Sequence, residues 1–332
     1  MLGCTAKATV RRLSTLIDMS ELAQRPVLIL GGCGFIGSHL VDRCVASGRA
    51  VRVVGRRPER YRLPVPSVQY FSGEFSDRTV LQPALAGVET VIHLVSTTHP
   101  KTSNDDPLFD LQSNLLATVD CLQQCVAARV RKVVFLSSGG VIYGNPSACP
   151  VPETAPTEPL CSYGIVKLAI EKYLALFQSL HGMETVVVRA ANPFGPRQNP
   201  SGGQGLIAAL LARLAIGQPF EIWGDGQVVR DYLYVEDLAE AVCRVTFSPC
   251  PSQVYNVGSG RGHSILDVVA EIGTALQVEP QISFRPGRAF DVKRVWLDIA
   301  KIQAELGWAP QTSFATGIQR TWRFVRSLPP SC

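Results

Sequence analysis

Tyr163 and Lys167 are the two residues of this sequence whose types and spacing best suit acid–base chemistry. They stand four positions apart near the start of a helix predicted over Cys161–Leu180, so their side chains share one face. A phenol with a pKa of about 10 is a poor base at neutral pH, but nearby positive charge favours the phenolate. Such a phenolate could accept a proton from a substrate hydroxyl. Taken alone, the pair is better explained by a surface tyrosine and a surface lysine.

Gly31, Gly34 and Gly37 follow an apolar run at Val27–Leu30 and open a predicted helix. Glycines in this position allow a tight turn, close approach of the backbone to a pyrophosphate and close packing of helix on strand. The N-terminus of the helix offers unpaired N–H groups to the anion. The segment therefore predicts a dinucleotide site, with an ordinary glycine-rich turn as the alternative. The positive ring of a bound nicotinamide would favour the Tyr163 phenolate further.

Gly55, Arg56 and Arg57 stand at the end of the second predicted strand, where NAD-binding proteins usually present an acidic residue to the ribose 2′-hydroxyl. Two guanidinium groups suit a 2′-phosphate and offer the hydroxyl no acceptor, so this chemistry favours NADP. A solvated basic turn is the alternative.

These residues belong to a chain that alternates short apolar runs with amphipathic segments of helical length, which predicts strands and helices around a parallel sheet. We expect strands at Val27–Leu30, Ala50–Val54, Val68–Phe71, Thr90–Leu94, Lys132–Ser137 and Glu184–Arg189. We expect helices near Gly37–Ser47, Thr79–Ala86, Asp110–Ala128 and Cys161–Leu180. The predicted fold class is α/β, a doubly wound parallel sheet (Rossmann fold) whose ligands lie beyond the carboxyl ends of the strands.

The regular alternation breaks down after residue 192, where Gly, Pro, Gln and Trp become frequent. We expect a dinucleotide-binding domain over 26–190 and a smaller, interleaved C-terminal α/β substrate lobe over 191–332. The run Val254–Val257 is predicted to return as a strand of the large sheet. Residues 1–25 contain no apolar core of signal-peptide length and are predicted to be a mobile leader.

The composition argues against several classes of protein. Of the 332 residues, 46% are hydrophobic and 18% are charged, and no run reaches the ~18 apolar residues of a membrane span. The net charge of +5 comes from scattered Lys and Arg, which argues against nucleic acid as the main partner. The ten cysteines form no CxxC pair and no cluster of metal-ligand spacing, so we expect no metal site and a reducing, cytoplasmic location.

The order of motifs resembles the extended short-chain dehydrogenase/reductases of the NAD-dependent epimerase/dehydratase family, and most of all the nucleotide-sugar epimerases near UDP-glucose 4-epimerase. The resemblance runs from about Val27 to Trp322 and rests on GGCGFIGSHL, HLVS, LSSGGVIYG, YGIVK, RAANPFGPRQ, GDGQVVRDYLYVEDLAEA, YNVGSG and LGWAP. It implies a catalytic Tyr–Lys pair, bound NAD(P), a nucleotide diphospho-sugar in the C-terminal lobe and a homodimer. The family suggests NAD as the cofactor where Arg56 and Arg57 favour NADP.

The resemblance also implies roles for single residues. Catalysis would fall to Tyr163 and Lys167, with Ser138 as the nearest hydroxyl. The cofactor would contact Gly31, Gly34, Phe35, Ile36, Gly37, Arg56, Arg57, Glu74, Phe75, Leu94, Val95, Ser96, Asn114, Tyr163 and Lys167. The diphospho-sugar would contact Asn192, Arg230 and Arg285, because a diphosphate needs fixed bidentate donors. For Arg230 the alternative is an ion pair with Asp231 or Asp237.

The chain departs from the family at Gly139, where related enzymes carry a Ser or Thr that hydrogen-bonds the reacting oxygen. Loss of a positioned hydrogen bond can raise the barrier by several kcal/mol. Gly140 and Val141 replace the Asp and Glu of the 4,6-dehydratases. Neither residue can carry a proton, so elimination of water is not expected.

Three functions follow from these observations. The first is a nucleotide-sugar epimerase that forms a 4-keto intermediate and leaves the cofactor unchanged. The second is an NADP-dependent reductase of a keto sugar or another carbonyl, favoured by Arg56, Arg57 and Gly139. The third is a cofactor-binding scaffold without turnover, favoured by Gly139 alone and opposed by the intact Tyr163 and Lys167.

Overall fold

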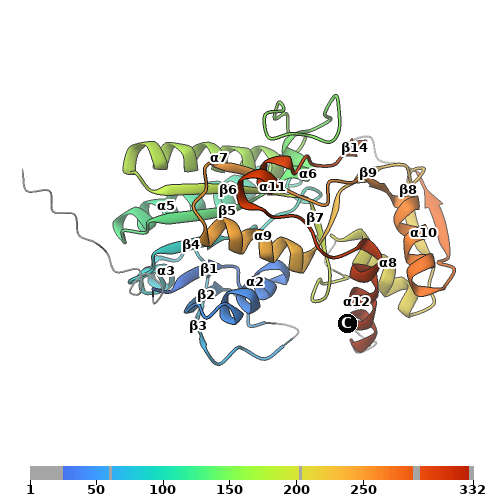
Figure 1. Ribbon diagram of the computed structural model, residues 1–332, viewed down its shortest axis with the longest axis horizontal. Helices are drawn as coiled ribbons and strands as arrows, with labels where there is room; N and C mark the ends of the chain where they lie inside the picture. The colour runs from blue at the N-terminus through green and yellow to red at the C-terminus, as the bar shows by residue number, and fades with distance from the viewer. Residues whose placement is uncertain (1–24, 60–61, 202–203, 287–291, 329–332) are drawn as a thin grey trace, which may run out of the picture.

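A computed structural model of the chain describes residues 25–59, 62–201, 204–286 and 292–328. The leader predicted over 1–25 lies outside these ranges except for Arg25. Figure 1 shows a large sheet between layers of helices, with a smaller group of elements gathered at one end. That group contains α8 (Leu206–Ala215), α10 (Ile265–Leu276) and α12 (Phe314–Ser327).

The large sheet has seven strands, all parallel, in the order β11-β6-β5-β4-β1-β2-β3. Their bounds are β1 Val27–Leu30, β2 Val51–Gly55, β3 Val68–Ser72, β4 Thr90–His93, β5 Lys132–Ser138, β6 Glu184–Ala190 and β11 Val254–Val257. The strands are near-continuous apolar runs because helices cover both faces of the sheet. The prediction of a doubly wound parallel sheet is confirmed, as is the return of Val254–Val257 beside β6.

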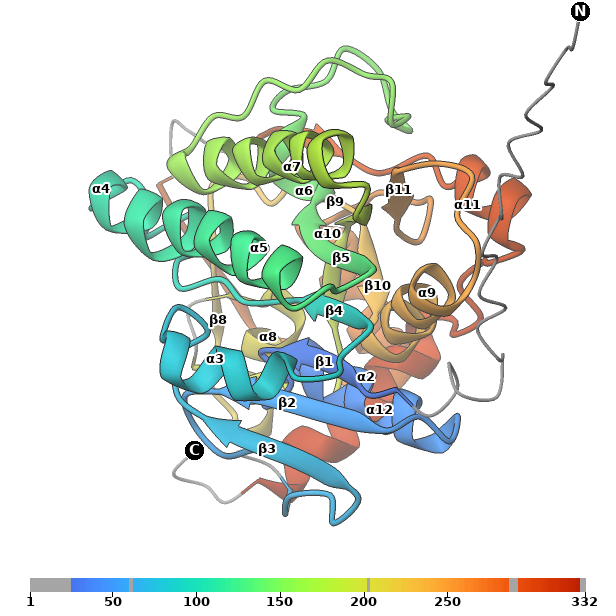
Figure 2. The same cartoon turned by 90° about the vertical axis from the view of Figure 1, so that its left-hand side faces the viewer.

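Two buried clusters of side chains divide the helices between the faces of the sheet. One face carries α2 (Phe35–Ala46) and α9 (Val235–Phe247), with α11 (Ala300–Leu306) beside β11. The other face carries α3 (Arg78–Leu85), α5 (Ala117–Ala127) and α7 (Ser162–His181), the last two side by side in Figure 2.

The helix predicted over Asp110–Ala128 starts earlier and has three parts. The short α4 (Pro107–Asp110) leads into a π-helical turn, η1 (Leu111–Leu116), which continues as α5. A π-turn inserts an extra residue into the helical repeat, and such turns are common at functional sites. The one-turn helix α6 (Gly139–Ile142) follows β5.

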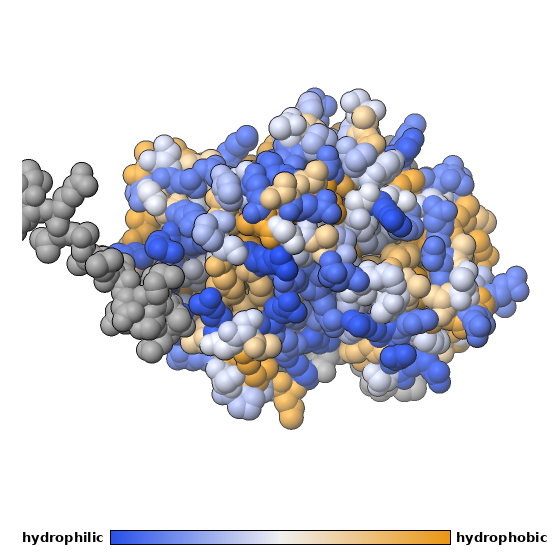
Figure 3. Space-filling view, viewed as in Figure 1, coloured by the Kyte–Doolittle hydropathy of each residue, from blue (hydrophilic) through white to orange (hydrophobic). Residues whose placement is uncertain are grey.

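The second group of elements contains small sheets built from β7 (Asn192–Phe194), β8 (Phe220–Trp223), β9 (Val229–Arg230), β10 (Tyr232–Tyr234), β12 (His263–Ser264), β13 (Ile282–Arg285) and β14 (Arg294–Val295). It has its own apolar core, in which Phe194 contacts Tyr234 and Phe314 edge-on. On the face drawn in Figure 3, hydrophilic and hydrophobic residues are interspersed. None of the helices in the described ranges is long and apolar enough to cross a membrane.

Candidate active site

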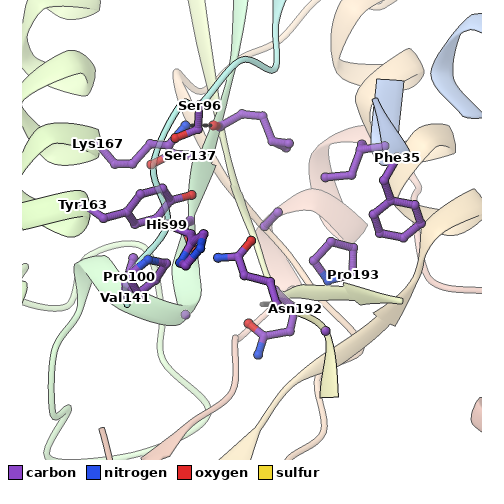
Figure 4. A pocket seen from close by; sticks show the side chains of 18 of the residues that line it. Phe35, Ser96, His99, Pro100, Ser137, Val141, Tyr163, Lys167, Asn192 and Pro193 are labelled. Atoms are coloured by element: carbon purple, nitrogen blue, oxygen red, sulfur yellow. Dashed lines mark hydrogen bonds between the residues drawn. The ribbon is translucent and has the colours of Figure 1, made fainter. Parts of the chain in front are cut away.

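A cleft of about 740 Å³ opens beyond the carboxyl ends of β1, β4, β5 and β6. The glycine turn after β1 lines it, as does the chain around Asn192 and Arg230. Tyr163 and Lys167 project into it from α7, across the cleft from Phe35, Asn192 and Pro193 (Figure 4). This is the position at which doubly wound sheets bind their ligands.

The glycine turn has the geometry that a pyrophosphate requires. Gly31 has φ +85°, which L side chains rarely adopt. A Cβ at Gly37 would overlap the carbonyl of Gly31, so only glycine lets α2 start this close to β1. Gly31, Gly34, Phe35, Ile36 and Gly37 all line the cleft, where the N-terminus of α2 is directed. The turn therefore fits the diphosphate of a dinucleotide.

Tyr163 and Lys167 share one face of α7, as their spacing predicts. The Lys167 ammonium lies 5.6 Å from the centre of the Tyr163 ring and donates to the carbonyl of Leu136 at 3.0 Å. Burial lowers the pKa of Lys167 to about 8, against the attraction of Asp110 and Glu171. Burial also raises the pKa of Tyr163 to about 12, helped by Cys161 and Asp110. Within the protein alone, burial therefore outweighs the opposing hydrogen bond from Ser138, and the phenol keeps its proton.

Ser138 provides a hydroxyl beside Tyr163, whereas Gly139 stands where related enzymes carry a Ser or Thr. Ser138 lines the cleft, and its hydrogen bond to Tyr163 favours the phenolate. Gly139 is buried, and a Cβ there would lie 2.7 Å from Cδ1 and 2.8 Å from Cδ2 of Leu297. A Ser at position 139 would thus meet Leu297, and Ser138 is the hydroxyl that reaches the phenol.

A buried network supports the strands beneath the pair. Arg189 of β6 forms an ion pair with Glu171 of α7 at 2.7 Å, and both side chains are almost fully buried. The Ser137 hydroxyl donates to Glu171 at 2.5 Å, and Arg189 donates to the Tyr143 hydroxyl at 2.9 Å. Since Glu171 lies one turn after Lys167, this network fixes α7 against the sheet.

Two of the three predicted substrate residues lie at the cleft. Asn192 and Arg230 line it, and Arg230 donates to its own neighbour, the Val229 carbonyl, at 2.9 Å. The carboxylates of Asp231 and Asp237 accept from backbone amides of other segments. Arg285 lies elsewhere, on β13, where it pairs with exposed Glu221 at 2.6 Å.

Some predicted cofactor residues line the cleft and others do not. Leu94 and Ser96 line it, and Val95 packs against Gly31. The exposed Arg56 lies 3.8 Å from Glu74, Arg57 is exposed beside it, and buried Phe75 packs on His93, all outside the cleft lining. Asn114 lies behind the wall, where its Oδ1 accepts from the Thr97 amide at 2.9 Å.

Sequence reasoning missed residues in the loop after β4. Thr98, His99 and Lys101 line the cleft, and Figure 4 shows His99 near Tyr163. Behind this loop lies buried Asp110, for which the sequence predicts no more than the first position of a helix. No pattern in the sequence assigns these residues, because the loop has no periodicity and its course depends on tertiary contacts. Among the described residues, no group of three or more His, Cys, Asp or Glu gathers as a metal site.

A seven-stranded doubly wound sheet with a glycine turn and a Tyr–Lys pair facing one cleft defines an enzyme of the extended short-chain dehydrogenase/reductase type. Residues 27–258 match the model of the "NAD dependent epimerase/dehydratase family". The chain belongs to this family, which confirms the resemblance predicted from its motifs.

Individual relatives agree with this assignment. The UDP-glucose 4-epimerase of Mycolicibacterium smegmatis is 35% identical over 310 residues, which cover 90% of this chain and 98% of the relative. The structure of UDP-glucose 4-epimerase from Thermotoga maritima with UDP-glucose has a TM-score of 0.86 at 31% identity, covering 91% of this chain and 98% of that one. The Thermus thermophilus UDP-glucose 4-epimerase in complex with NAD has a TM-score of 0.84 at 34% identity, covering 91% and 99%.

Proposed function

We propose that this protein is a nucleotide-sugar epimerase that resembles the UDP-sugar 4-epimerases and works through a 4-keto sugar. The proposal rests on one observation: the glycine turn, Tyr163, Lys167 and Arg230 all line the same cleft. The UDP-glucose 4-epimerases among the relatives support a nucleotide diphospho-sugar as the substrate. Residues 26–190 would hold the cofactor and 191–332 the sugar nucleotide.

The chain's own residues would handle the proton. Tyr163 accepts the proton of the sugar hydroxyl and later returns it, because its phenol faces the cleft and Ser138 hydrogen-bonds it. Lys167 keeps a positive charge near the phenol and so favours the phenolate as the proton moves. The nicotinamide, when bound, supplies the hydride acceptor and donor. Arg230 and Asn192 would hold the diphosphate and orient the sugar.

The cofactor would be a nicotinamide dinucleotide. The relative in complex with NAD supports NAD, and the contact between Arg56 and Glu74 leaves less positive charge for a 2′-phosphate. Gly55 offers no carboxylate to a 2′-hydroxyl, which favours NADP. Mass spectrometry of the supernatant from denatured protein would identify the retained dinucleotide and thereby the preference.

A homodimer would form through the outer face of α5 and α7. Large apolar side chains are exposed along these helices and just before them: Leu108, Phe109 and Leu116 before α5, and Ile165, Leu176 and Leu180 on α7. Exposed apolar groups that gather on one surface usually mark a contact with another protein. A cytoplasmic location is proposed from cysteine usage alone.

The test is incubation of the purified protein with UDP- and dTDP-hexoses, followed by chromatography of the sugar nucleotides. We expect interconversion of epimers without added cofactor, and Tyr163→Phe should lower kcat by about 10² to 10⁴-fold. Tyr173→Phe, a matched change on the exposed side of α7, should retain activity. No interconversion with any sugar nucleotide would contradict the proposal.

The second candidate is an NADP-dependent reductase of a keto sugar, favoured by exposed Arg56 and Arg57. A reductase would consume NADPH in proportion to product, which the absorbance of the reduced nicotinamide measures. If Tyr163→Phe kept every measurable function of the wild type, the third candidate, a cofactor-binding scaffold without turnover, would be favoured instead.

A further inference from the structure

Asp110 is a fully buried carboxylic acid located behind the wall of the cleft. It is the last residue of α4, directly before the π-turn η1, and its exposure is 0%. A buried charge is costly unless it is hydrogen-bonded or compensated, so a carboxylate kept in this place calls for a reason.

Three hydrogen bonds hold the carboxylate, and each comes from a different segment. The Thr98 hydroxyl donates to Oδ1 at 2.6 Å, and the Asn114 amide donates to the same oxygen at 2.9 Å. The Ser162 hydroxyl donates to Oδ2 at 2.7 Å. All three donors are neutral, and none of the salt bridges within the described ranges involves Asp110. The hydrogen bonds therefore satisfy the oxygens without neutralising their charge.

The hydrogen-bond partners of Asp110 connect it to the loop that lines the cleft and to the start of α7. Thr98 belongs to the loop after β4 that lines the cleft. Ser162 is the first residue of α7 and directly precedes Tyr163. Asn114 in turn holds the backbone amide of Thr97 at 2.9 Å. One side chain thus joins the cleft loop, the π-turn and the start of the catalytic helix.

The charge of Asp110 also acts on the groups that face it from α7. It raises the pKa of Lys167, and it contributes to the raised pKa of Tyr163, after burial and Cys161. The other titratable groups around the pair come from three elements: Glu171 of α7, which also raises the pKa of Lys167, His93 of β4, which burial keeps neutral with a pKa of about 3, and His99 of the cleft loop, whose pKa burial and Lys101 lower.

We propose that Asp110 is a positioning residue of the Tyr163–Lys167 pair, joining the cleft loop to α7 and holding a negative charge beside the pair. The kinetic part of this proposal rests on the proposed function, because it concerns the pair that would move the proton. The structural part stands on the three hydrogen bonds alone.

The sign of the expected effect follows from the charge. A negative group disfavours phenolate and favours ammonium, so removing it lowers the pKa of both partners. Activity that needs one proton on the pair rises when the first proton leaves and falls when the second leaves. Both limbs of the pH profile should therefore move to lower pH when Asp110 loses its charge.

The experiment compares the pH profile of kcat/KM for the wild type, Asp110→Asn and the control Asp106→Asn. Asn keeps the shape of Asp, and the Ser162 hydroxyl can accept from its amide, so the hydrogen bonds can re-form. Asp106 is an exposed N-cap of α4, for which Asn is an equally good cap. We expect both limbs of Asp110→Asn to shift down by about one pH unit, and Asp106→Asn to match the wild type. If the limbs of the Asp110→Asn profile stayed at the wild-type pH, or if only the rate fell, the charge of Asp110 would not act on the pair as proposed.

A second measurement separates this inference from the proposed function. The ionisation of Tyr163 is followed by NMR of an isotope-labelled tyrosine ring carbon, assigned with Tyr163→Phe. Its pKa should fall in Asp110→Asn whether or not any sugar nucleotide is turned over, and an unchanged pKa refutes the proposal. An inactive wild type would contradict only the epimerase function. If Asp110→Asn gives no folded protein, Asp110→Ser takes its place with the same expected shift.

Discussion

At the scale of single residues, the chemistry depends on how Tyr163 loses its proton. Burial raises the pKa of its phenol to about 12 and lowers that of Lys167 to about 8, so near neutral pH the protein by itself holds the phenol protonated, while Lys167 keeps its ammonium by a small margin. A positive ring bound on the cleft side would stabilise the phenolate. Tyr163 is thus suited to accept a proton only when a positively charged ring is bound in the cleft.

The hydroxyl of Ser138 leads to a prediction about kcat. Ser138→Ala should lower kcat by about 10²-fold because it removes the hydroxyl that bonds Tyr163. Adding the family hydroxyl through Gly139→Ser should not restore this loss, since its Cβ meets Leu297. It should instead lower the free energy of unfolding by about 1–3 kcal/mol through overpacking. Steady-state rates and denaturant unfolding check both effects, and a rescue of Ser138→Ala by Gly139→Ser would contradict this assignment.

Single residues also mark the limit of what the sequence could predict. Motif and spacing located the glycine turn, Tyr163 and Lys167, because local backbone geometry determines their positions. They did not show that Arg285 pairs with Glu221 on β13 or that Asn114 lies behind the cleft wall. Those contacts join segments that are distant in the chain, and no local pattern encodes them.

At the scale of elements, alternating hydrophobic runs were sufficient to predict the large sheet. The expected strand Lys132–Ser137 agrees with β5 to within one residue, and Val254–Val257 forms β11 as predicted. The same periodicity could not reveal the π-turn η1, because one extra residue barely changes an apolar pattern. That turn separates α4 from α5 and follows directly on Asp110, so the missed detail lies beside the site.

The exposed apolar side chains of α7 lead to a prediction about the oligomeric state. A double change of Leu176→Glu and Leu180→Glu should convert a dimer into monomers, because charges would have to be buried in the contact. Light scattering coupled to size-exclusion chromatography measures the mass. Ile216→Glu, an equally exposed apolar residue at the end of α8, should leave the mass unchanged. A monomeric wild type, or a double variant that stays dimeric, would rule out this face.

At the scale of the whole molecule, the interleaving of the two groups of elements builds the cleft. The chain leaves the large sheet after β6, forms β7 with Asn192, and returns to the sheet at β11. Parallel pairing of β7 with β10 puts Asn192 opposite Tyr232, two residues after Arg230, and both Asn192 and Arg230 line the cleft. If Tyr163 accepts the proton and Arg230 and Asn192 hold the diphosphate, as proposed, this arrangement would suit a reaction in which the sugar turns while its nucleotide stays fixed.

The most direct test of the epimerase account is the reaction carried out in heavy water with the sugar nucleotide that the protein converts. A hydrogen that leaves as hydride and returns within the closed cleft does not exchange with solvent, whereas the hydroxyl proton handled by Tyr163 does. Mass spectrometry and NMR of the product should therefore show the epimer without deuterium on carbon. Deuterium at the inverted carbon, or no epimer from any nucleotide sugar, would contradict the account.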